Sequence, residues 1–90
     1  MYPPPFSLSQ VVYHPEKGFD FTSTEVRVIQ YAICDYNVKE IADFLHSTED
    51  NVYRHRSRIM DKTPAKSFEG LIALLLIQKV FTGTDVKTDL

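Results

Sequence analysis

The sequence predicts an all-α fold, a four-helix domain with a central helix-turn-helix and an extended N-terminal arm. Four helix-start signals occur along the chain, each followed by apolar residues at helical spacing. The second and third of these helices are separated by only a few residues, as a helix-turn-helix requires. We therefore expect an arm over residues 1–20, a helical domain over residues 21–82 and a polar tail over residues 83–90.

The composition is that of one small globular domain. Of the 90 residues, 43% are apolar and 24% are charged, which argues against a disordered tail. Cys34 is the single cysteine, so no intramolecular disulfide can form, and a cytoplasmic location is expected. No signal peptide is visible, and the longest apolar run, at residues 71–77, is too short to suggest a membrane span.

Charge is unevenly distributed along the chain. Ten Lys and Arg residues stand against 12 Asp and Glu residues, and the resulting net charge of −2 counts against DNA binding. Residues 53–66 nevertheless contain five basic residues and one acidic residue, a local net charge of +4. This segment is therefore the part of the chain best suited to meet a nucleic acid.

The N-terminal arm is too apolar for a free linker. Three consecutive prolines at residues 3–5 predict a stiff, extended segment. Residues 9–13 (SQVVY) favour a short strand or an extended segment, and residues 14–18 favour a turn. We expect the arm to pack on the domain or on a partner.

The first helix begins at a capping box formed by Thr22 and Glu25 and runs to about Cys34. Its apolar residues recur at helical spacing and predict a buried face of Val28, Ile29, Ala32 and Ile33.

The central helix-turn-helix is predicted over residues 37–62. Asn37 and Glu40 form a second capping box, and Val38, Ile41, Ala42 and Leu45 give the following helix one apolar face. A new start signal at Ser47 and Thr48 leaves room for only a tight turn. The next helix should bury Val52, Ile59 and Met60 and expose Asp50, Tyr53, Arg54, Ser57 and Arg58.

The exposed face of this third helix carries groups that suit DNA. Arginine is shaped to grip guanine with two hydrogen bonds, and Tyr and Ser can reach phosphates or base edges. Lys62, just beyond, can lie along the DNA backbone. The plainer interpretation is a solvated face on which Glu49, Asp50 and Asp61 neutralise the arginines.

The fourth helix, predicted over residues 68–81 behind a Ser67 cap, is unusually apolar. Phe68, Leu71, Ile72 and Leu75 can serve the core. Leu74, Ile77 and Phe81 are then left over, with some of the surface of Leu76 and Val80, and a large exposed apolar patch marks a partner surface. We expect a twofold dimer through Leu74, Ile77 and Phe81; the alternative is that the N-terminal arm covers them.

Over about residues 21–81, the segments FTSTEVRVI and NVKEIADFLHSTEDNVYRHRSRIMDKT resemble the LuxR/GerE-type helix-turn-helix family. The resemblance implies a DNA-binding regulator with its third helix in the major groove and its fourth helix in a homodimer. By position it implies base contacts from Tyr53, Arg54 and Ser57, and backbone contacts from Lys39, Thr48, Arg56 and Arg58. His55 resembles the half-buried structural histidine of the family.

The chain departs from the family pattern at two turns. Asp35 stands where the family usually has glycine, and Thr63 and Pro64 replace a usual Leu-Gly. With only an arm before the domain, the chain resembles a stand-alone bacterial regulator of the GerE kind, or an effector piece of something larger. Double-stranded DNA is the expected partner, and RNA polymerase or a regulatory protein is a further candidate.

Two rival interpretations stay open. Arg54, Arg56 and Arg58 also fit the rhythm of sigma-factor region four, and the net acidic charge fits a protein-interaction module that binds no DNA. An enzyme is not expected, because the histidines and Cys34 lack metal-ligand spacing and no glycine-rich phosphate loop is present. No cofactor or metal is therefore expected.

Overall fold

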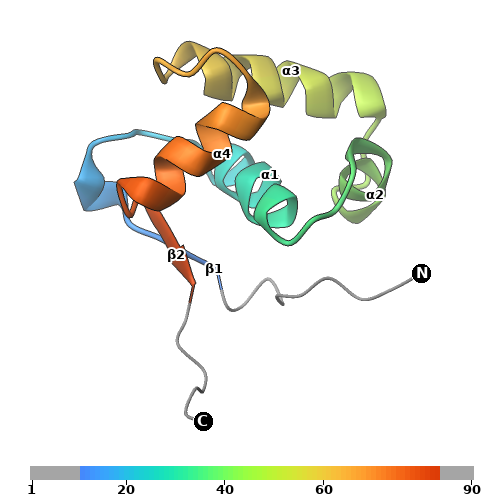
Figure 1. Ribbon diagram of the computed structural model, residues 1–90. Coiled ribbons are helices and arrows are strands. Elements are labelled where there is room, and N and C mark those ends of the chain that lie inside the picture. Colours follow the sequence, from blue (N-terminus) through green and yellow to red (C-terminus); the bar gives the residue numbers. More distant parts are fainter. Residues whose placement is uncertain (1–10, 84–90) are drawn as a thin grey trace, which may run out of the picture.

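The computed structural model describes residues 11–83, which form four helices and one small antiparallel sheet (Figure 1). The elements in chain order are β1 (Val11–Tyr13), a 3₁₀ turn (Pro15–Lys17), α1 (Ser23–Ile33), α2 (Val38–Phe44), α3 (Glu49–Asp61), α4 (Phe68–Ile77) and β2 (Phe81–Gly83). The four predicted helices are confirmed. The all-α prediction was incomplete, because β1 and β2 pair into a two-stranded sheet.

Each helix begins where the sequence predicts it. The Thr22 hydroxyl accepts the backbone N–H of Glu25, and the Glu25 carboxylate accepts the N–H of Thr22. Asn37 and Glu40 form the same reciprocal pair. Thr48 and Ser67 cap α3 and α4 with their hydroxyls. These short-range bonds satisfy N–H groups that have no partner inside the helix.

Three helices end on a residue in the left-handed conformation that glycine usually takes. Asp35, His46 and Lys79 have φ angles of 70°, 53° and 59°. After His46, the N–H of Ser47 returns to the Ala42 carbonyl at 2.9 Å, which closes the turn between α2 and α3. Asp35 thus adopts the backbone conformation suited to the glycine that it replaces, since Asp tolerates this region better than most residues.

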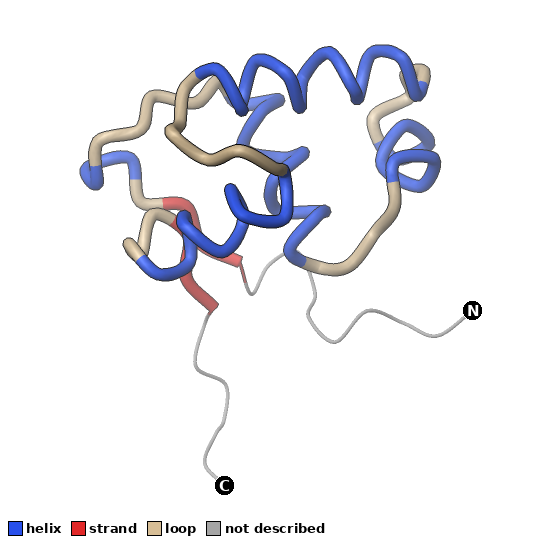
Figure 2. Tube along the Cα trace, turned by 45° about the horizontal axis from the view of Figure 1, so that its top comes forward, coloured by secondary structure: helices blue, strands red, loops and turns tan. Residues whose placement is uncertain are grey.

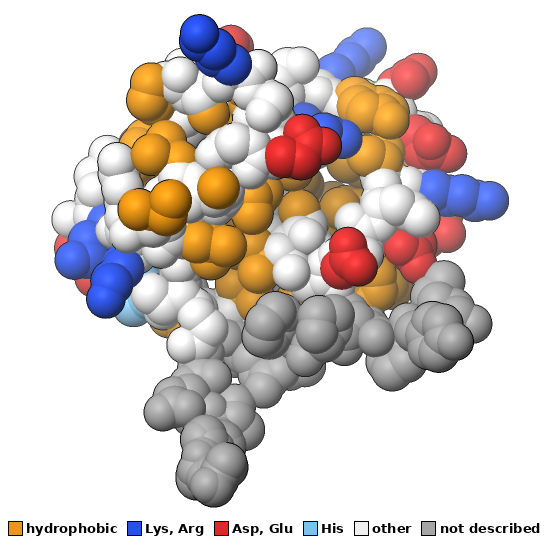
Figure 3. All heavy atoms as spheres, viewed as in Figure 1, with side chains coloured by type: hydrophobic (Ala, Val, Ile, Leu, Met, Phe, Trp, Pro, Cys, Tyr) orange, Lys and Arg blue, Asp and Glu red, His pale blue; other side chains and the backbone are white. Residues whose placement is uncertain are grey.

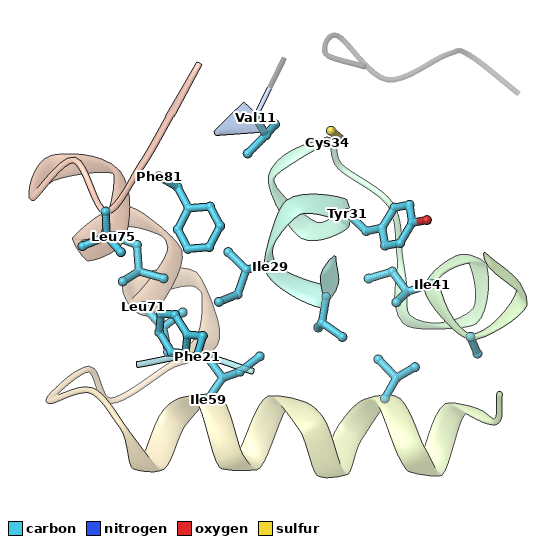
Figure 4. Close-up of a cluster of buried hydrophobic side chains, with 14 residues drawn as sticks. Val11, Phe21, Ile29, Tyr31, Cys34, Ile41, Ile59, Leu71, Leu75 and Phe81 are labelled. Atoms are coloured by element: carbon cyan, nitrogen blue, oxygen red, sulfur yellow. The ribbon is translucent and has the colours of Figure 1, made fainter. Parts of the chain in front are cut away.

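The core lies between α1 and the other elements (Figure 4). Val28 and Ile29 of α1 are fully buried. Fully buried partners come from the other elements: Val52 and Ile59 from α3, Leu71 and Leu75 from α4, and Phe81 from β2. The views in Figures 1 and 2 place α3 and the β1–β2 pair on opposite sides of this core.

The predicted end of the fourth helix was wrong. The helix ends at Ile77, and the N–H of Val80 bonds the Leu75 carbonyl at 2.9 Å. The chain then turns Phe81 into the core, where its ring centroid lies 5.0 Å from that of Tyr13. Burying this ring, which is 0% exposed, removes a large apolar surface from water. Phe81 is therefore a core residue and not part of an exposed patch.

Part of the predicted arm belongs to the core. Val11 is 5% exposed, and its carbonyl accepts a hydrogen bond from the Gln30 side chain of α1 at 3.0 Å. Tyr13 pairs with Phe81 in the sheet. The expectation that the arm packs on the domain is thus confirmed for residues 11–13. The three prolines at residues 3–5 and the tail at residues 84–90 lie outside the described residues.

Replacing Ile59 by alanine should destabilise the domain by about 2–5 kcal/mol, because it opens a cavity between α3 and the core. Ile77→Ala removes the same atoms from a side chain that is 77% exposed and should change stability by less than about 0.5 kcal/mol. Urea unfolding followed by circular dichroism measures both. Equal losses would contradict this placement of the two residues.

Candidate nucleic-acid interface

Only one face of α3 packs against the rest of the domain. Val52 and Ile59 are seven residues apart, so they lie on one side of the helix, and both are fully buried. Met60, His55 and Arg56 are partly buried at the margins. The opposite face is exposed to solvent, and it carries the residues that the sequence predicts there: Asp50, Tyr53, Arg54, Ser57 and Arg58.

The arginines of this face are not neutralised by the neighbouring acids. Within residues 11–83 the ion pairs join His14 to Glu16 and Lys62 to Glu25. The plainer interpretation expects Glu49, Asp50 and Asp61 to neutralise the arginines. In that part of the chain, none of these three acids forms an ion pair with an arginine. The positive charges of Arg54 and Arg58 are free to meet an anion.

The other predicted contact residues surround this face. Lys39, the second residue of α2, is exposed. Thr48 is exposed as well, although its hydroxyl already accepts the N–H of Asn51 at 3.1 Å to cap α3. Arg58 lines a shallow cleft with His55 of α3 and residues at the start of α1.

Arg56 points toward α4. Its guanidinium carbon lies 4.2 Å from the centre of the Phe68 ring and 5.4 Å from that of Tyr53. A cation held over aromatic faces is stabilised by the negative charge at the centre of each ring. Arg56 therefore connects α3 to α4, while Tyr53 still has 52% of its surface exposed.

Lys62 ties the end of α3 to the start of α1. Its ammonium donates to the Glu25 carboxylate at 2.6 Å and to the Asp20 carbonyl at 2.8 Å. Glu25 is only 3% exposed and is the single buried charged side chain of the described residues. Burial alone would raise the pKa of Glu25, but the hydrogen bonds from Lys62 and Thr22 and the charge of Lys62 together lower it.

The apolar surface of α4 is smaller than predicted. Leu76 and Ile77 are 41% and 77% exposed, and Leu74 is partly buried. Hydrophobic side chains gather over α4 on the face shown in Figure 3. The candidate dimer surface thus consists of Leu74, Leu76 and Ile77.

Cys34 has the properties of a core residue. It is fully buried, and this burial raises the pKa of its thiol, so it is a poor nucleophile. Residues 11–83 contain no cluster of three His, Cys, Asp or Glu side chains suited to a metal. In the same part of the chain, no helix has the length and apolar character needed to cross a membrane.

Comparison with known proteins assigns the chain to a family. The model of the bacterial regulatory proteins of the luxR family matches residues 20–75. The chain belongs to the LuxR family. The matched range covers all of α1, α2 and α3 and most of α4. Neither the curated proteins nor the solved structures contain a significant match.

LuxR-family helix-turn-helix domains are typically DNA-binding transcription regulators and not enzymes. The match therefore favours this family over the sigma-factor region four that the arginine spacing also fits.

Sequence reasoning missed two features of the LuxR-family domain. The Glu25–Lys62 pair joins residues 37 positions apart, and the sequence indicates Glu25 only as part of a helix cap. A cleft of about 610 Å³ between the end of α1, the start of α2, α3 and α4 is lined in part by Tyr53, Arg56 and Phe68. No local pattern indicates either feature, because both arise from packing between helices.

Replacing Lys62 by methionine should destabilise the domain at neutral pH by about 1–3 kcal/mol, since Glu25 stays buried without its main partner. This loss of stability is smaller than the loss expected when a fully buried ion pair is broken, because the Lys62 side chain is 34% exposed.

The stabilising contribution of Glu25 in the native chain is present at neutral pH and is lost as the pH falls through its lowered pKa. The two proteins should therefore converge in stability in acid, which thermal unfolding across a pH series measures. A constant difference at all pH values would contradict this coupling.

Proposed function

We propose that the domain is a transcription regulator that binds double-stranded DNA with α3 in the major groove. The observation that carries the proposal is the free outer face of α3, which presents Tyr53, Arg54, Ser57 and Arg58 while the inner face is buried. With 13 residues the helix is about 20 Å long. A major groove about 12 Å wide admits such a helix.

The contacts divide into two kinds. Tyr53, Arg54 and Ser57 lie in the middle of the exposed face and are proposed to meet base edges. Lys39, Thr48 and Arg58 lie around it and are proposed to meet phosphates, which position the protein.

Two further predicted phosphate contacts are weaker candidates. Arg56 is engaged by Phe68, and Lys62 uses two of its three ammonium hydrogens inside the protein. Each is proposed to contact one phosphate. A loss of DNA affinity in a Lys62 variant would also reflect the stability that the Glu25 pair supplies, so other residues test the interface better.

We further propose that two copies associate through α4. Leu76 and Ile77 of α4 expose apolar surface, Leu74 is partly exposed, and removing this surface from water favours association. A twofold dimer would place its two α3 helices on half-sites about 10 base pairs apart. The alternative, a protein-interaction module without DNA binding, would use this surface or the cleft beside Phe68 for another protein.

Arg54→Ala should weaken binding to the selected DNA site by about 1–3 kcal/mol and binding to a scrambled duplex far less, because only the first requires base contacts. Fluorescence anisotropy with the two duplexes at one salt concentration measures this. Arg27→Ala is the control, since Arg27 is an exposed arginine of α1 and its removal changes the net charge equally. Equal losses on both duplexes for Arg54→Ala would contradict a base-reading role.

Ile77→Glu should give a folded monomer, because a charge in the centre of an apolar interface is unfavourable. Sedimentation equilibrium measures the mass, and circular dichroism verifies the fold. Gln78→Glu adds the same charge one residue further along, at an exposed position, and should leave the dimer intact. A dimer that persists in both Ile77→Glu and Leu74→Glu would place the interface elsewhere.

A further inference from the structure

The outer face of α3 has an acidic residue at each end. Asp50, Arg54, Ser57 and Asp61 follow one another at intervals of four, three and four residues, so they form one stripe along the helix. Asp50 precedes the buried Val52 by two residues, and Ser57 precedes the buried Ile59 by two. Two residues correspond to about 200° of rotation about the helix axis, so the stripe lies opposite the buried pair. Asp50 therefore points away from the core, in the same direction as Arg54.

The carboxylate of Asp50 is exposed and has no internal partner. In residues 11–83 it takes part in no ion pair and no side-chain hydrogen bond. Its neighbours are engaged with one another: Asn51 donates its side-chain amide to the Ser47 hydroxyl at 3.0 Å and its backbone N–H to Thr48. Within the described residues Asp50 is thus free of internal partners, and it is the acidic residue of the first turn of α3 that lies on the outer stripe.

A carboxylate in this position needs a hydrogen-bond donor, and in the major groove the base donors are the amino groups of adenine and cytosine. Phosphates repel it, and so do the oxygen acceptors that guanine and thymine present in the major groove. The amino group of adenine lies beside the N7 acceptor, which repels a carboxylate, so the amino group of cytosine, from which Asp and Glu accept, is the better partner. The N-terminal residues of a recognition helix are the ones that contact base edges, and Asp50 is the second residue of α3.

We propose that Asp50 is a specificity-determining residue that accepts a hydrogen bond from the amino group of a cytosine in the major groove. This inference rests on the proposed DNA-binding function. It assigns the acidic residue, which otherwise counts against DNA binding, a role in rejecting duplexes that place guanine or thymine at that position. Asp61 lies in the last turn of α3, at the opposite end from the base-reading residues.

Asp50 also affects the stability of α3, and the experiment must separate this effect from base recognition. An acid in the first turn of a helix is stabilised by the partial positive charge of the helix N-terminus. Glu49 shares this effect, because it is the first residue of α3. Glu49 lines the cleft beside α2 and α4 and does not belong to the outer stripe, so Glu49→Gln is a matched control.

The experiment selects bound duplexes from a random pool with the full chain and with Asp50→Ala, Asp50→Asn and Glu49→Gln. The native chain and Glu49→Gln should both select a cytosine at one position. Asp50→Ala should lose the preference at that position alone, and Asp50→Asn should shift it to adenine, since Asn bonds two atoms of adenine. In the native chain, exchanging this cytosine for thymine should weaken binding by roughly tenfold or more.

Two different failures can be told apart. If the native chain binds the pool but Asp50→Ala and Asp50→Asn select the same sequences as it does, Asp50 reads no base and this inference falls alone. Selection of adenine by the native chain would likewise overturn the assignment to cytosine. If the folded native chain binds no duplex even at low salt, the proposed function itself falls, and this inference with it.

Discussion

Burial of Val52 and Ile59 in the core is the constraint on which the rest of the structure depends. These two side chains determine the rotation of α3 about its own axis, because neither can leave the core without exposing apolar surface. Once the rotation is set, Arg54 and Ser57 must face solvent. The burial of two side chains of α3 thus decides which chemistry the domain presents to a partner.

The two ends of α3 are held by polar contacts. Thr48 caps the first turn, and the left-handed His46 brings α2 and α3 close together. At the other end Lys62 bonds the buried Glu25 carboxylate, so a charge pair joins the end of α3 to the cap of α1. These contacts restrict the position of the helix, and a rigid helix loses less conformational entropy when it binds. The domain therefore combines an apolar anchor with polar restraints at both ends.

The features that the sequence predicted are the ones that depend on neighbours a few residues apart. The Thr22 and Asn37 capping boxes span three residues, and the exposed face of α3 follows from helical periodicity alone. The burial of Phe81 was not predicted, because it depends on pairing with a strand about 70 residues earlier in the chain. The partner of Glu25 was missed for the same reason: Lys62 reaches it only after α1 and α3 have packed.

The most direct test of the DNA-binding face is an NMR titration of the isotope-labelled chain with a short mixed-sequence duplex at low salt, followed through the backbone amides. The proposal predicts that the largest shifts cluster along the outer face of α3, from Asp50 to Arg58, with smaller shifts near Lys39, and that added salt reverses them. Shifts confined to α4, or no shifts from a folded chain, would contradict DNA binding through α3.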